Sequence, residues 1–72
     1  MNRLYKIIGG VEVLISMSYH DYEWTVVVGG ADGSECGLDK FLRTTDRTEA
    51  ERYYRRQCKE IGQLGHCVMT SF

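Results

Sequence analysis

The chain of 72 residues is long enough for one small domain, whose core is marginal unless disulfides, a metal or a partner chain add to it. Hydrophobic residues at 43% and charged residues at 26% are typical of a folded globular protein and argue against disorder. A formal net charge of -1 excludes a protein that is strongly basic overall, as many nucleic-acid binders are, and a strongly acidic DNA mimic. We therefore expect a single domain over residues 1–72.

The three cysteines are an odd number without close spacing, whereas a secreted disulfide scaffold normally has an even and denser set. We expect reduced thiols in a cytoplasmic protein. The apolar run near the N-terminus is interrupted by Gly9, Gly10 and Glu12, so it has neither the core of a signal peptide nor the length of a membrane span. The sequence thus predicts a soluble cytoplasmic protein.

Alternate positions from Tyr5 to Tyr19 carry Tyr, Ile, Val and Met side chains with one glycine among them, which is the period of a strand with one buried face. The alternation passes through Gly9 and Gly10 without a change of phase. One long strand bent at the glycines keeps this phase, and so does a hairpin whose loop runs from Gly9 to Val11. We favour the long bent strand, because glycine inside a strand often marks a bend or a bulge.

The stretch from Val11 to Val28 predicts a β-hairpin with a two-residue turn at His20-Asp21. A register slip of one residue would move serine and glutamate side chains into the apolar row, so we expect the register that keeps this row apolar. On the opposite, mostly polar face, the same register sets Leu14 against Val27. The pairs of the apolar face are Tyr19 with Tyr22, Met17 with Trp24, Ile15 with Val26, and Val13 with Val28.

A glycine-rich loop is expected over residues 29–34. In residues 35–43 the apolar side chains fit either a helical turn (Leu38, Phe41, Leu42) or a strand (Cys36, Leu38, Lys40, Leu42), and we favour a short third strand because a sheet of only two strands is rarely stable. A helix follows, with a capping-box-like start at Asp46 and Glu49 and a natural stop at Gly62. Its apolar stripe for the sheet is formed by Ala50, Tyr54, Cys58 and Ile61, with Tyr53 alongside.

The last residues, 66–72, are β-prone and predict a final strand beside the N-terminal one. The chain therefore predicts an α+β fold in the order β-β-β-α-β. In this fold a small antiparallel sheet carries one amphipathic helix on its apolar face.

The clearest indication of a binding site is on the outer face of the predicted helix. Basic residues recur there at spacings of three and four, opposite the apolar stripe. The planar guanidinium group of arginine can form two parallel hydrogen bonds to a phosphate or to a carboxylate of an acidic protein surface. The alternative is a solvated face, common on helices, in which Glu51 pairs with Arg55 and Arg56 with Glu60. The candidate partner-binding residues are Arg47, Arg52, Tyr53, Arg55, Arg56 and Lys59.

The remaining reactive side chains do not form a recognisable motif. Zinc sites typically contain closely spaced pairs of ligands in the sequence. Such pairs are absent among the candidate metal ligands Cys36, Cys58, His66 and Cys67. A cysteine nucleophile with His20 or His66 as base would have no orienting group, and the loop at 29–34 lacks the phosphate-loop spacing. Most aromatic residues share the apolar face, which disfavours base stacking. We expect a non-enzymatic protein without cofactor or metal.

Leu14 and Val27 form a small apolar spot on the otherwise polar face of the sheet. Such a spot beside an edge strand supports dimerisation or the addition of a partner strand. The alternative is a pair of scattered surface hydrophobes, which need no explanation.

With one helix on one sheet and no catalytic residues, the whole chain resembles in size and layout the small inhibitor proteins of phages and mobile elements, such as anti-CRISPRs. Those inhibitors are often acidic, whereas the net charge of this chain is near neutral. The resemblance implies a protein that blocks a host defence complex by occupying its surface. The contact set would then be Arg52, Tyr53, Arg55, Arg56 and Lys59.

Two other functions use the same surfaces. A nucleic-acid-binding or regulatory module would place the basic helix face on phosphates. A homodimeric accessory protein would associate through an edge strand or through Leu14 and Val27. The sequence leaves the choice between monomer and homodimer open.

Overall fold

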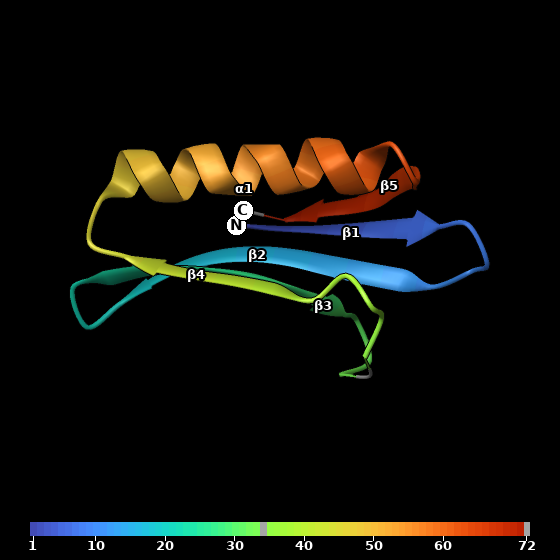
Figure 1. The fold of residues 1–72 in the computed structure, drawn as a ribbon, viewed down its shortest axis with the longest axis horizontal. Helices are drawn as coiled ribbons and strands as arrows, with labels where there is room; N and C mark the ends of the chain where they lie inside the picture. The colour runs from blue at the N-terminus through green and yellow to red at the C-terminus, as the bar shows by residue number, and fades with distance from the viewer. Residues whose placement is uncertain (34, 72) are drawn as a thin grey trace.

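The computed structural model describes residues 1–33 and 35–71, which form a five-stranded antiparallel sheet with one helix on one face (Figure 1). The order of strands across the sheet is β4-β3-β2-β1-β5. The predicted α+β class is confirmed, and the final strand lies beside the first as expected. The elements are β1 (Asn2–Ile7), β2 (Glu12–His20), β3 (Glu23–Gly30), β4 (Lys40–Thr44), α1 (Arg47–Gly62) and β5 (Gly65–Ser71).

The N-terminal alternation belongs to two strands, so the favoured single bent strand is wrong and four strands precede the helix. In the β1–β2 hairpin Tyr5 pairs with Val13. Gly9 and Gly10 adopt φ values of 93° and 80°, a region that glycine enters without steric cost. The Ile7 N–H donates to the Val11 carbonyl at 2.9 Å and closes the loop. Because the hairpin pairs odd residues with odd residues, alternation alone does not distinguish it from a bent strand.

The hairpin of β2 and β3 is present, but its turn lies at Asp21-Tyr22, one residue later than predicted. These residues have φ values of 51° and 65°, as a type I′ turn requires, and this turn matches the twist of the two strands. Tyr22 is therefore an exposed turn residue and does not belong to the apolar face. Every predicted pair is displaced by two positions along β3.

Apart from Tyr22, the corrected pairing keeps each side chain on its predicted face, because strand side chains alternate with period two. On the apolar face Ile15 now lies opposite Val28. On the other face Leu14 lies opposite Gly29 and Val27 opposite Ser16, so the two residues of the predicted apolar spot are diagonal neighbours. The remaining pairs of the apolar face are Val13 with Gly30, Met17 with Val26, and Tyr19 with Trp24.

The strand expected within residues 35–43 is confirmed as β4, which begins at Lys40 and pairs with β3. The residues before it, Cys36 and Leu38, pack against the core from outside the strand. The predicted loop and the predicted last strand each include one residue outside the described part of the chain, Ser34 and Phe72.

Helix α1 begins and ends where the sequence predicts. The Asp46 carboxylate accepts a hydrogen bond from the Thr48 N–H at 2.9 Å, which satisfies one of the free N–H groups of the first turn. The helix ends at Gly62, and its buried residues are the four of the predicted apolar stripe together with Gln57.

The core lies between α1 and the sheet. Val13, Ile15, Val26 and Val28 of the two central strands are the largest fully buried side chains, and each contributes about 1.5–3 kcal/mol by leaving water. Helix α1 lies along these strands and leaves its outer side free (Figure 1). The core therefore fixes which side chains of α1 face solvent.

Candidate binding face on helix α1

The candidate site is the outer side of α1. We name Arg52, Arg55, Arg56 and Lys59 the cationic face; all four side chains are exposed. With 3.6 residues per turn they lie on the side of the helix opposite Ala50, Tyr54 and Ile61, which are buried against the sheet. Four positive charges therefore lie within about 11 Å of helix length.

Two of the nearby carboxylates, Glu51 and Glu60, are engaged with other cations, whereas Glu49 forms no salt bridge with any described residue. Glu51 accepts a hydrogen bond from Arg47 Nε at 2.8 Å, and Glu60 Oε2 lies 3.2 Å from Lys40 Nζ on β4. The predicted pairs Glu51–Arg55 and Arg56–Glu60 do not form. Within the described residues, no member of the cationic face has a carboxylate within salt-bridge distance.

Arg47 has a different environment from the cationic face. Its guanidinium carbon lies 5.6 Å from the centre of the Trp24 ring, in addition to the contact with Glu51. The Trp24 ring is itself 4.8 Å from the ring of Tyr19. Arg47 thus joins the first turn of the helix to the end of the β2–β3 hairpin, where a cation over an aromatic ring contributes about 0.5–1 kcal/mol. Its role in the structure is local packing.

A hollow of about 370 Å³ lies beside the cationic face, between α1 and β4. Arg52 and Arg56 line it, and the half-buried Tyr53 ring and Leu42 give it apolar walls. The structure thus brings together three of the six predicted binding residues. Asp46, Thr48 and Glu49 complete the hollow at the start of the helix.

The sequence did not single out Leu42 as part of this site, although the alternation of β4 carried the signal. Leu42 pairs with the buried Val26, so it belongs to the helix side of the sheet. If residues 40–44 are taken as a strand, the alternation of its side chains places Leu42 on the helix side of the sheet and Phe41 on the opposite side.

A buried polar cluster lies beneath the helix on the side of β1. Burial, and secondarily the neighbouring Cys58, raise the pKa of Tyr54 to about 12. Burial likewise raises the pKa of Tyr5, and a hydrogen bond to Tyr5 raises the pKa of Arg3. By geometry the Tyr54 hydroxyl has no hydrogen-bond partner, and neither has the side-chain oxygen of Gln57. The Tyr5, Tyr54 and Gln57 side chains are buried, so they serve the core and do not form a surface site.

We expect Tyr54→Phe to raise the free energy of unfolding at pH 7 by about 0.5–1 kcal/mol, because it removes a buried hydroxyl without a partner. The pKa of Tyr54 in the folded state is higher than its ordinary value of 10.0, so above pH 10 the hydroxyl ionises more readily in the unfolded state than in the folded state. The folded state of the wild type is therefore unaffected below pH 10 and loses stability as the pH rises towards 12. The advantage of Tyr54→Phe should therefore grow above pH 10.

Urea unfolding followed by circular dichroism at pH 7, 9 and 11 measures this difference. Tyr22→Phe, which removes an exposed hydroxyl, is the control at pH 7 and should change the free energy by less than about 0.5 kcal/mol. A loss of about 1 kcal/mol or more at pH 7 in Tyr54→Phe would show that the hydroxyl has a partner in solution.

The other predicted reactive residues lie apart from this face. Cys36, Cys58 and Cys67 are free thiols, half-buried, buried and exposed respectively. In the described part of the chain, no three His, Cys, Asp or Glu side chains gather where they could hold a metal ion. No helix in residues 1–33 and 35–71 has both the length and the apolar character needed to span a bilayer.

Comparison with known proteins finds no matching family model, no similar sequence among curated proteins and no similar solved structure.

Proposed function

We propose that the protein is a small non-enzymatic binding module that attaches, through the cationic face of α1, to an acidic surface of a larger protein or ribonucleoprotein complex. The observation that supports this most is the absence of a carboxylate partner for Arg52, Arg55, Arg56 and Lys59 among the described residues. Arg47 and Lys40, by contrast, are each paired with a glutamate.

The unpaired cations repel one another, so a surface that supplies carboxylates would relieve this repulsion and gain charge-assisted hydrogen bonds. The adjacent hollow adds Tyr53, and tyrosine and arginine are the residues that protein interfaces use most as anchors. The net charge of the chain is only -1, so the positive charge is local to one face. A local charge supports docking in one orientation better than general attraction to polyanions.

The size and layout of the protein suggest how such binding would act. A rigid helix on a sheet occupies a surface without moving parts, which is the mode of action of the small phage and mobile-element inhibitors that the chain resembles. We therefore propose occupation of a target surface, of the kind that blocks a host defence complex, as the consequence of binding.

A nucleic-acid-binding module is the second candidate, because the same four unpaired cations also suit phosphates. Two differences separate the candidates. Phosphate contacts weaken steeply with salt and survive the replacement of arginine by lysine. A bidentate arginine–carboxylate contact is weakened by that replacement.

Fluorescence anisotropy with a labelled Asp- and Glu-rich peptide, single-stranded DNA, duplex DNA and RNA tests the proposal at about 50 and about 150 mM salt. We expect the peptide to bind, and Arg56→Glu to weaken this binding by about tenfold, since one charge-assisted contact contributes about 1.5–3 kcal/mol. Lys6→Glu, the same change of charge on the far face of the sheet, should leave it within about twofold. Binding to nucleic acid that exceeds binding to the peptide and fades with salt would replace the proposal with the second candidate.

A further inference from the structure

Among residues 1–33 and 35–71, no helix or strand covers the face of the sheet opposite α1 (Figure 1). Each of the five strands places one bulky apolar side chain on this face. The registers of the four strand pairs put these residues on the side away from the helix. Phe41 lies opposite Val27, and Leu4 lies between Leu14 and Met69. We name these five residues the sheet band: Phe41, Val27, Leu14, Leu4 and Met69.

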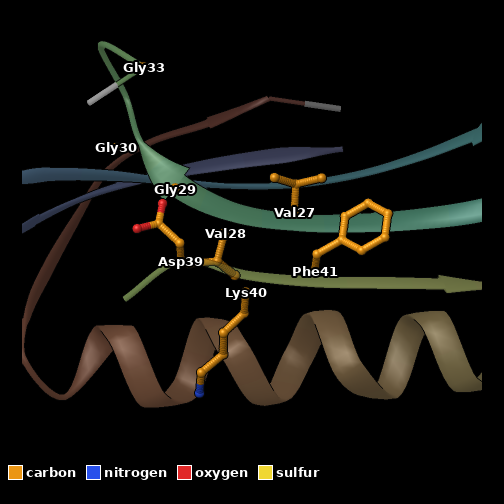
Figure 2. A pocket seen from close by; sticks show the side chains of 8 residues that line it. All are labelled: Val27, Val28, Gly29, Gly30, Gly33, Asp39, Lys40 and Phe41. Atoms are coloured by element: carbon orange, nitrogen blue, oxygen red, sulfur yellow. The ribbon is translucent and has the colours of Figure 1, made fainter. Parts of the chain in front are cut away.

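The sheet band is substantially exposed. Phe41, Met69 and Val27 are 57%, 54% and 40% exposed, while Leu4 and Leu14 are half-buried by their neighbours. In Figure 2, Val27 and Phe41 point away from α1, whereas Lys40 points towards it. A hollow of about 430 Å³ lies beside these two side chains. Adjoining exposed apolar side chains of this kind are a feature of association sites, whereas single scattered ones are not.

Four residues of the band have a neighbour without a bulky side chain on one side. Along each of four strands, the neighbour two positions away on the same face lacks a bulky side chain: Gly29 beside Val27, Ser16 beside Leu14, Asn2 beside Leu4, and Ser71 beside Met69. In the register of the sheet, Phe41 and Val27 lie in one row with the smaller Ser16, Asn2 and Ser71, and Leu14, Leu4 and Met69 lie in the next row with Gly29, so each row has a bulky part and a small part. Two such faces interdigitate when a two-fold axis sets the bulky residues of each copy over the small residues of the other.

The charges around the band favour a second copy over a strongly charged partner. Lys6 lies opposite Glu12 in the register of β1 and β2, at one end of the face. Arg43 lies at the other end, with its guanidinium carbon 5.4 Å from the centre of the Phe41 ring, and Asp39 lies beside Gly29. Charges of both signs are thus interspersed, and an oppositely charged partner gains nothing over an identical chain.

The extent of the face also fits a second copy. Five strands about 4.8 Å apart and about 17 Å of strand length bury on the order of 1,000 Å² of accessible surface in a face-to-face dimer. This area is at the lower limit for a specific interface, the size class in which weak and transient associations are found. A chain of 72 residues has a small core, and such an interface would add to it.

We propose that two copies pack face to face through the sheet band and form a two-fold sandwich with one α1 helix on each outer side. The dimer leaves both cationic faces in solvent, so it presents two binding surfaces on opposite sides. Self-association through the band does not depend on the function proposed for α1, because the two surfaces lie on opposite faces of the sheet.

Analytical ultracentrifugation from about 5 to about 500 µM tests this proposal, and we expect a monomer–dimer equilibrium with a micromolar dissociation constant. Val27→Lys should weaken the dimer at least tenfold, because it buries a charge at the centre of the face. Val11→Lys is the matched control, since Val11 is 42% exposed but lies in the β1–β2 loop, and it should associate like the wild type. Phe41→Ser provides a second variant if Val27→Lys loses its circular dichroism spectrum.

Three results would overturn the proposal: a wild-type protein that remains monomeric at the highest concentration, an undiminished dimer in both Val27→Lys and Phe41→Ser, or a dimer lost only in Val68→Lys. The last result would place the contact at the free edge of β5, whose residues are all exposed. Val27→Lys should still bind the acidic peptide through α1, so failure of the dimer and failure of the proposed function are distinguishable.

Discussion

Gly65→Ala should lower the free energy of unfolding by about 3 kcal/mol, because the first residue of β5 lies directly against the backbone of β1. A β-carbon at Gly65 would lie 2.6 Å from Ile7 Cα and 2.8 Å from the Lys6 carbonyl carbon, and would overlap the Lys6 carbonyl oxygen. These are backbone atoms, so no side-chain rotation relieves the contact. The start of β5 must move away from Ile7 and lose its pairing with β1.

Gly62→Ala is the matched control three residues earlier. A β-carbon there would lie 3.5 Å from Tyr5 Cε2, an ordinary van der Waals distance, and alanine suits a helix better than glycine. We expect a change between zero and a gain of about 0.5 kcal/mol. Urea unfolding of both variants measures the difference. Equal stabilities would show that Gly65 does not approach β1 as closely as the structure places it.

Ile15→Ala should lower the free energy of unfolding by about 3–4 kcal/mol. Ile15 is 0% exposed at the centre of β2, and its truncation leaves a cavity where α1 packs on the sheet. A domain of 72 residues has a total stability of about 4–10 kcal/mol, so this is a large part of it. The melting temperature should fall by about 15–20 °C.

Ile8→Ala removes the same atoms from a side chain that is 86% exposed, and it should change the free energy by less than about 0.5 kcal/mol. Thermal melts followed by circular dichroism compare the two variants directly. If Ile8→Ala were as destabilising as Ile15→Ala, the assignment of the buried face of β2 would be wrong.

Part of the fold could be predicted because burial imposes a period on the sequence. Alternation assigned the residues of β2 and β3 to their correct faces, and helical spacing identified the apolar stripe of α1 together with its outer cationic face. The signals at Asp46 and Gly62 also located the ends of the helix, because caps satisfy backbone groups that the helix leaves free.

The register of the β2–β3 hairpin could not be predicted from the same period. A displacement by two residues keeps every face unchanged, so only the turn distinguishes the registers. Neither His20-Asp21 nor Asp21-Tyr22 contains the glycine that normally marks a type I′ turn. The choice between a bent strand and a hairpin at Gly9 and Gly10 was undetermined for a similar reason, since both keep the phase.

The ion pairs of α1 show a second limit of sequence spacing. Glu51 is four residues from both Arg47 and Arg55, so either pair is possible on a helix. In the folded protein Arg47 is also held by the Trp24 ring, which no local pattern reveals, and Glu51 pairs with it. This tertiary contact leaves Arg55 without a carboxylate, and the candidate site depends on it.

The most direct test of the binding role of α1 is a titration of the ¹⁵N-labelled protein with the Asp- and Glu-rich peptide, followed by ¹H–¹⁵N NMR spectra. We expect the largest shifts at the amides of the cationic face and of Tyr53, with small changes at Arg47. Shifts that instead cluster on the β2–β3 turn or on the sheet band, or that are spread evenly over the chain, would contradict a binding surface on α1.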